Sequence, residues 1–86
     1  MYQVSLARPA QRFYEDADAA LQRRLDQAFA QLAAGPSTAS NVKRLQPPLA
    51  TYHRLRVGDY RIIFSVDHPQ RLVVVASIEH RSRAYR

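Results

Sequence analysis

The second half of the sequence carries most of the groups that could do chemistry on a phosphate. Three arginines, Arg54, Arg56 and Arg61, fall within the stretch YHRLRVGDYRIIFSV (residues 52–66), which otherwise has the composition of a buried β-hairpin. The final segment HRSRAYR (residues 80–86) adds three more arginines. A guanidinium group binds phosphate oxygens through two parallel hydrogen bonds, and fixed cations stabilise negative charge that develops on a reacting phosphate. These residues therefore indicate binding of a phosphate-containing polyanion or chemistry on it.

The charge distribution supports this interpretation. The sequence has 86 residues, a net charge of +6 and 13 basic residues, all but one of them arginine. Residues 1–41 balance four arginines against four acids, whereas residues 42–86 hold nine basic residues against three acids. Such asymmetry suggests a polyanionic partner. The alternative is a merely soluble basic protein whose arginines pair with acids or extend into water, although three acids cannot pair with nine cations.

Composition also excludes several classes of protein. The length fits one domain, residues 1–86. There is no cysteine, and the three histidines are scattered, so we expect neither a disulfide nor a metal site, and no cofactor. No apolar run approaches the ~20 residues that span a membrane, and the N-terminus lacks a signal-peptide core. We therefore expect a cytoplasmic protein without a membrane partner.

Local signals predict the secondary structure. Residues 2–7 alternate weakly, as in a first strand, and Pro9 suits the first turn of a short helix. Asp18 is a plausible N-cap for a helix from about Ala19 to Ala34, which Gly35 ends. Its apolar residues share one helical face: Leu21, Leu25, Ala28, Phe29 and Leu32. The next segment, residues 36–50, has no clear period, and we expect an ordered loop around Val42 and Leu45.

A hairpin and a last strand follow. A two-residue Gly58-Asp59 loop of type II′ would place Val57 opposite Tyr60, Arg56 opposite Arg61 and Leu55 opposite Ile62. His68-Pro69, together with Gln70, is expected to form the next turn. Residues 71–80 are the most apolar segment and predict a central strand.

Side chains alternate across a strand, so parity predicts the two faces of the sheet. The face expected to meet the helices carries Leu55, Val57, Tyr60, Ile62, Phe64 and Val66. The opposite face carries Arg54, Arg56, Arg61, Ile63 and Ser65. On the last strand, strict alternation divides the residues into two sets. One set is Leu72, Val74, Ala76 and Ile78. The other set, expected on the arginine face, is Val73, Val75, Ser77 and Glu79. Arginines directly opposite each other repel by roughly 0.2–1 kcal/mol per pair. A sequence tolerates this repulsion most readily where an anion occupies the gap, so we expect a concave anion site on this face.

Two segments, YHRLRVGDYRIIFSVD and VVVASIEHRSRAYR, resemble the RelE/ParE superfamily of bacterial toxin–antitoxin toxins, as do LAAGP and VKRLQPPLATYHRLRVGDYR. The elements RVGDYRIIF and HRxxxY are the most specific, and the ending HRSRAYR is more similar to RelE-type ribonucleases than to ParE-type gyrase poisons. The resemblance covers nearly the whole sequence. It implies an α+β domain of order β-α-α-β-β-β, in which an antiparallel sheet of about four strands packs on an N-terminal helical hairpin.

The resemblance also implies an activity and partners. RelE-type toxins are metal-independent endoribonucleases that cleave mRNA in the ribosomal A site, and a cognate antitoxin neutralises them in a hetero-oligomer. Two alternatives remain open. One is a ParE-like toxin that inhibits DNA gyrase without catalysis. The other is a basic nucleic-acid-binding module, or a degenerate toxin that lacks a competent base.

The family's site residues carry over by position. Arg61 would stabilise transition-state charge, Arg81 would bind phosphate and protonate the leaving group, Tyr85 would stack on or orient a base, and Arg54 would bind phosphate and assist proton transfer. Further RNA contacts are expected from the following residues: Lys43, Tyr52, Arg56 and Arg83.

The general base is open, because RelE-type members can carry two lysines where this sequence has Tyr52 and Arg54, and an arginine with a pKa above ~12 is a poor base. His80 is either catalytic or a structural histidine at a strand end, and Glu79 either pairs with an arginine or acts as the base. His53 follows the core parity and is expected to be structural, and His68 is assigned no role.

Overall fold

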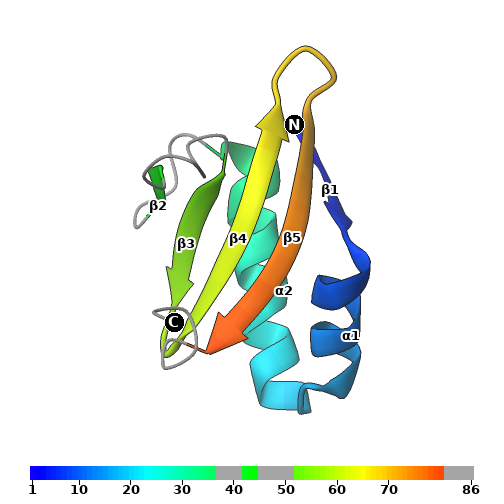
Figure 1. The fold of residues 1–86 in the computed structure, drawn as a ribbon, viewed down its shortest axis with the longest axis vertical. Helices are drawn as coiled ribbons and strands as arrows, with labels where there is room; N and C mark the ends of the chain where they lie inside the picture. Colours follow the sequence, from blue (N-terminus) through cyan, green and yellow to red (C-terminus); the bar gives the residue numbers. More distant parts are fainter. Residues whose placement is uncertain (37–41, 45–51, 81–86) are drawn as a thin grey trace.

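A computed structural model describes residues 1–36, 42–44 and 52–80, with only the backbone for residues 42–44. The elements in chain order are β1 (Gln3–Leu6), α1 (Arg8–Asp16), α2 (Ala19–Ala34), β2 (Val42–Arg44), β3 (His53–Val57), β4 (Tyr60–Asp67) and β5 (Leu72–His80). They form one five-stranded sheet in the order β1-β5-β4-β3-β2, with α2 crossing behind it in the view of Figure 1. No helix in these described ranges is both long and apolar enough to cross a membrane.

The predicted α+β class is confirmed, but the sheet differs from the expectation in two respects. Residues 42–44, expected to be loop, form the short edge strand β2, which pairs antiparallel with β3. β1 pairs with β5 in parallel, so the sheet is mixed. The prediction of an antiparallel sheet was therefore wrong for this one pair, which joins residues 3–6 to residues 72–75. β5 lies between β1 and β4 and is interior, as its apolar sequence indicates.

Both helices begin where local signals place them, and α2 also ends where Gly35 predicts. Pro9 lies in the first turn of α1, where a missing N–H costs nothing. Asp18 caps α2, and its Oδ1 accepts a hydrogen bond of 2.8 Å from the Leu21 backbone N–H. Gly35 follows the last turn and donates its N–H to the Gln31 carbonyl at 3.1 Å. These caps fix where α2 starts and stops across the back of the sheet.

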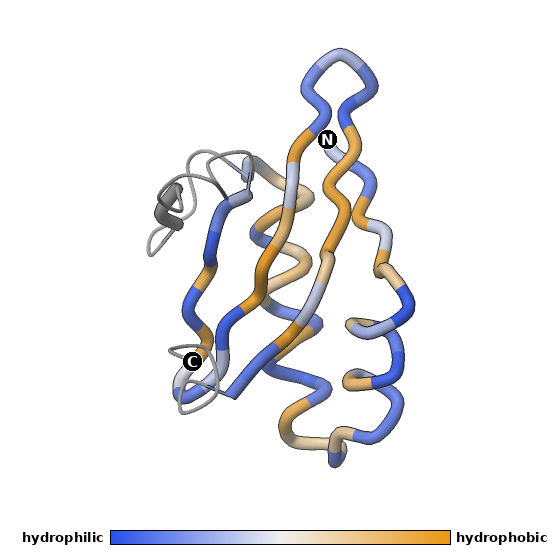
Figure 2. The backbone as a smooth tube through the Cα atoms, viewed as in Figure 1, coloured by the Kyte–Doolittle hydropathy of each residue, from blue (hydrophilic) through white to orange (hydrophobic). Residues whose placement is uncertain are grey.

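The core lies between the helices and one face of the sheet. Helix α2 contributes Leu25, Ala28 and Leu32, and α1 contributes Ala10. The strands contribute Leu55, Ile62, Phe64, Val73, Val75 and Ile78. For β3 and β4 the buried residues belong to the apolar set expected from parity, and two further members, Val57 and Val66, are partly buried against the core. Figure 2 shows the apolar residues concentrated along β4 and β5.

A β-bulge overturns the strict alternation predicted for β5. Phe64 pairs with Val75 but Ile63 pairs with Ser77, so Ala76 has no partner on β4. Because the bulge adds one residue, Val73 and Val75 face the core before it, and Ile78 faces the core after it. The two predicted sets are therefore wrong as continuous sets, since each of them changes face at the bulge.

The predicted β3–β4 turn is confirmed. The pairs Val57–Tyr60, Arg56–Arg61 and Leu55–Ile62 have the expected register. Gly58 has φ +58°, a left-handed conformation that glycine adopts without steric cost. The Arg24 guanidinium from α2 lies against Gly58, and an added Cβ would overlap its Nη2. The turn therefore requires glycine for its backbone angle, whereas the exposed Arg24 side chain could move aside for an added Cβ.

Candidate functional site

A row of three charged residues crosses the sheet face opposite the core. Arg56 of β3 lies opposite Arg61 of β4, and Arg61 lies opposite Glu79 of β5. Directly opposite residues of antiparallel strands project to the same face, with Cβ atoms about 4.5–5.5 Å apart. The three charged side chains therefore project from neighbouring positions on adjacent strands. We call Arg56, Arg61 and Glu79 the charged row.

Arg61 is the most enclosed member of the charged row. Its side chain is only 3% exposed, and its Nε atom is buried, whereas Arg56 is exposed and Glu79 is half-buried. Arg61 is also the only buried polar or charged residue within residues 1–36 and 52–80. A cation held by packing needs little reorganisation when negative charge develops beside it. The burial thus holds the Arg61 side chain in a fixed position between Arg56 and Glu79.

Arg54 lies one level further along the same face. It is half-buried and pairs with Ile63, which in turn pairs with Ser77 of β5. On the edge strand β2, the backbone register puts Lys43 opposite Arg54. The fold therefore assembles Arg54, Arg56 and Arg61 on one face, as the parity predicts, next to the small polar residue Ser77.

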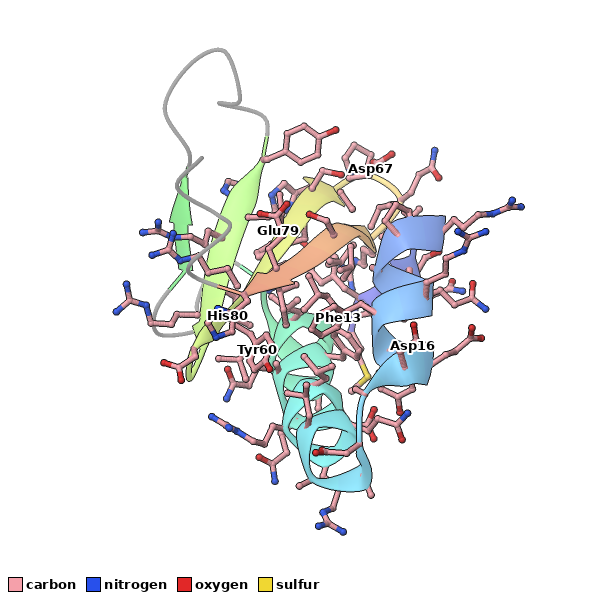
Figure 3. The ribbon with its side chains drawn as sticks, turned by 60° about the horizontal axis from the view of Figure 1, so that its bottom comes forward. Phe13, Asp16, Tyr60, Asp67, Glu79 and His80 are labelled. Atoms are coloured by element: carbon pink, nitrogen blue, oxygen red, sulfur yellow. The ribbon has the colours of Figure 1, made fainter. Side chains whose placement is uncertain are left out.

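His80 lies on the opposite face, toward the helices. It pairs with Tyr60, and their rings meet edge to face with centroids 5.2 Å apart. Tyr60 in turn contacts the Phe13 ring of α1 at 5.6 Å. Figure 3 shows Glu79 on one side of β5 and His80 with Tyr60 on the other. The sheet separates His80 from the charged row, so its position favours the structural alternative over the catalytic one.

The remaining site residues fall into two groups. His53 faces the core side and its ring contacts Phe64 at a centroid distance of 5.5 Å, as its parity predicts, and Tyr52 is half-buried directly before β3. Arg81, Arg83 and Tyr85 lie outside the described residues, so their assigned roles remain predictions. Within residues 1–36, 42–44 and 52–80, no cluster of three or more His, Cys, Asp or Glu could hold a metal ion.

Sequence reasoning missed one cation near this region. The exposed Arg24 belongs to the polar face of α2, and its guanidinium reaches Gly58, which follows Arg56 by two residues. No periodicity within α2 indicates this contact, because it depends on where the helix crosses the sheet.

Comparison with known proteins agrees with the resemblance to toxins of the RelE/ParE superfamily. The family described as "ParE toxin of type II toxin-antitoxin system, parDE" matches residues 4–85. A search of curated proteins found no significant match. Among solved structures, the chain is similar to archaeal RelE in the RelE–RelB complex of Pyrococcus horikoshii, with a TM-score of 0.80, 23% identity, and coverage of 95% of this chain and 97% of that one.

Two further structures show the same fold. The isolated Escherichia coli RelE toxin matches with a TM-score of 0.76 and 18% identity, over 99% of this chain and 92% of that one. The YoeB/ParE toxin of Agrobacterium tumefaciens matches with a TM-score of 0.80 and 14% identity, over 91% of this chain and 96% of that one.

Proposed function

The chain belongs to the ParE toxin family of type II toxin–antitoxin systems, within the RelE/ParE superfamily, and from this premise we propose that it is a ribosome-dependent mRNA endoribonuclease. The proposed reaction needs no metal, because guanidinium groups supply the positive charge. The RNA 2′-OH attacks the adjacent phosphorus, the bond to the 5′-oxygen breaks, and the products are a 2′,3′-cyclic phosphate and a 5′-OH end.

The charged row is the observation that carries this proposal. Arg61 is 3% exposed, lies between Arg56 and Glu79, and has Arg54 one level away. The pentavalent phosphorane carries more negative charge than the starting phosphodiester, so a cation fixed beside it stabilises the transition state more than the ground state.

The remaining roles follow the resemblance. Arg54 and Arg56 bind the phosphates that flank the reacting one, and Tyr52 and Lys43 extend the RNA contact along β3 and β2. Arg81 protonates the leaving 5′-oxygen, Tyr85 stacks on or orients a base, and Arg83 adds a backbone contact. The ribosome presents A-site mRNA in one conformation, and such alignment supplies much of the rate in a site with few proton-transfer groups.

An antitoxin is the proposed protein partner. The similar structures from Pyrococcus horikoshii, Mycobacterium tuberculosis and Escherichia coli include toxin–antitoxin complexes. A cognate antitoxin that neutralises this chain would place acidic or apolar residues over the arginine face or the helices, and the two chains would form a hetero-oligomer. A copurified partner that contacts neither surface would contradict this.

One observation favours a second candidate function. The matching family is that of the ParE toxins, and the alternative kept open above is inhibition of DNA gyrase without catalysis. A gyrase inhibitor would use the arginines for binding alone and would not need a base or a leaving-group acid. The two candidates are therefore separated by RNA cleavage, not by anion binding.

Primer extension on mRNA in programmed ribosomes tests the proposal. Wild-type protein should produce cuts at the A-site codon, with cyclic-phosphate ends, and Arg61→Ala should abolish them. Arg71→Ala, at an exposed arginine in the β4–β5 turn, is the matched control and should cut normally. Wild-type protein that halts growth and inhibits gyrase supercoiling, yet cuts no mRNA, would establish the second candidate instead.

A further inference from the structure

We propose that Glu79 is the general base that removes the proton from the attacking 2′-OH, an inference that rests on the endoribonuclease function proposed above. Cleavage of this kind requires a proton acceptor, and the arginines of the face cannot serve because a guanidinium holds its proton until far above neutral pH. The acceptor must also lie beside the cation that stabilises the phosphorane. Glu79 meets both conditions.

The sheet register places Glu79 directly beside Arg61. The two residues are opposite each other on β5 and β4 and project to the same face. In the proposed complex the carboxylate would face the ribose hydroxyl, beside the guanidinium to which the proposed mechanism assigns the following phosphate. The Glu79 side chain is half-buried, which shields it partly from water but leaves it accessible to a substrate.

The β-bulge is what brings Glu79 to this face. Val73 and Val75 face the core, and without an extra residue strict alternation would turn Glu79 toward the core with them. The unpaired Ala76 reverses the alternation, so that Ile78 enters the core and Glu79 joins Arg61 on the arginine face. Bulges occur frequently next to active sites, where they redirect a side chain. Here the redirected side chain is the carboxylate.

Other proton acceptors in the described part of the chain are placed less well. His80 is on the helix side of the sheet, in ring contact with Tyr60. Asp67 is at the far end of β4, and its Oδ1 accepts the Gln70 N–H at 3.1 Å. Asp59 lies in the exposed turn, beyond the charged row. By contrast, none of the side-chain hydrogen bonds between described residues engages the Glu79 carboxylate.

The Glu79 carboxylate takes the proton of the 2′-OH while the 2′-oxygen forms a bond to phosphorus. The phosphorus–O5′ bond breaks, and its electron pair goes to the 5′-oxygen, which takes a proton from the leaving-group acid. Glu79 then loses its proton to water, and the acid regains one, so the protein returns to its starting state.

Single-turnover cleavage of A-site mRNA, at saturating protein and across pH 6 to 8.5, tests this role. Glu79→Gln keeps the size of the side chain but cannot accept a proton, and it should slow the maximal rate by about 10²–10⁴-fold. The residual rate should rise with pH, since hydroxide then replaces the base, whereas the wild-type rate should vary little. Glu79→Asp should retain part of the activity.

Asp59→Asn is the matched control, because it removes the same charge next to the charged row without touching the proposed base. It should cleave at the wild-type rate. Two results would overturn the proposal: a Glu79→Gln rate at saturating protein within threefold of that of Asp59→Asn, or, when the titration is extended to subsaturating protein, a Glu79→Gln defect that is present only there. The second would show that Glu79 supports binding or folding instead. If the wild-type protein itself cuts no mRNA, the endoribonuclease function fails, and this inference fails with it.

Discussion

The two faces of the sheet are built from the same strands, but one is apolar and buried and the other carries charged residues. On the helix side, Ile62, Phe64, Val73 and Val75 are fully buried against α1 and α2. On the other side, residues of the same strands form the charged row of Arg56, Arg61 and Glu79. The first face stabilises the folded state by removing apolar area from water, at about 25 cal/mol per Å². The second face lowers this stability, because it places two arginines opposite each other.

This difference indicates where stability and function reside. Two like charges directly opposite each other, such as Arg56 and Arg61, do not by themselves favour folding. This repulsion is tolerated because the apolar residues of β4 and β5 on the opposite face anchor both strands in the core. Variants on the two faces should therefore separate stability from activity.

The largest effect is expected on the helix face. Phe64→Ala should lower the free energy of unfolding by about 3–5 kcal/mol, because it removes a fully buried ring at the centre of the core. Urea denaturation monitored by circular dichroism measures the change. Ser65→Ala, on the neighbouring residue of the opposite face, should change stability by less than about 0.5 kcal/mol. Equal losses for the two variants would contradict the assignment of stability to one face.

Arg61→Lys should produce the corresponding effect on the other face. Lysine retains the charge but not the planar fork, so the maximal cleavage rate should fall by about 10²–10³-fold. The thermal midpoint should stay near that of Arg71→Lys, the control in the distant turn. A variant that cleaves normally would remove Arg61 from the chemistry, and one that unfolds would make its burial structural.

Asp18→Ala tests the support behind the helix face. Loss of the 2.8 Å cap bond to the Leu21 N–H should cost about 1 kcal/mol of stability. Asp18→Asn, which can still accept this bond, should cost much less. Cleavage at saturating protein should be unchanged in both, and a rate loss with intact folding would connect α2 to the charged row.

Arg56→Gln should stabilise the protein while weakening its interaction with RNA. Removing one of two opposed cations should raise the free energy of unfolding by about 0.2–1 kcal/mol. The gain should shrink as salt is added, because salt screens exposed charges. Arg12→Gln, at an exposed position of α1, is the control and should not stabilise. A destabilised Arg56→Gln would show that the positive charges of the row are already compensated in the folded protein, without a bound anion.

The smallest effect concerns the contact between the helices. The Tyr14 hydroxyl donates to Asp26 Oδ1 at 2.8 Å, and this hydrogen bond, followed by partial desolvation and the Asp26 charge, raises the pKa of Tyr14 above 10.0. A raised pKa means that the contribution to stability is present below pH 10 and is lost as the pH rises through the folded-state pKa. Tyr14→Phe should therefore unfold at a lower temperature than wild type at pH 8, and the difference should narrow above pH 10.

Local chemistry in the sequence determined much of this protein. Asp18 and Gly35 predicted the bounds of α2, since capping depends on the backbone within a few residues. Gly58-Asp59 predicted the turn and therefore the register that pairs Arg56 with Arg61. Parity then predicted which face of β3 and β4 is apolar. The resemblance carried by RVGDYRIIF and HRxxxY predicted the family, which the match over residues 4–85 confirms.

Only the tertiary structure decided the rest. The parallel pairing of β1 with β5 joins residues about 70 positions apart, and no local pattern indicates it. The bulge at Ala76 has no signature in an apolar run such as LVVVASI, because either face of β5 could be buried. It is fixed by the need to place Val75 and Ile78 in one core. Parity in the sequence had already placed Glu79 on the arginine face and His80 on the other, and the register confirms both positions. What the packing of the core decided is that Val73 and Val75, predicted to share the face of Glu79, lie on the helix side instead.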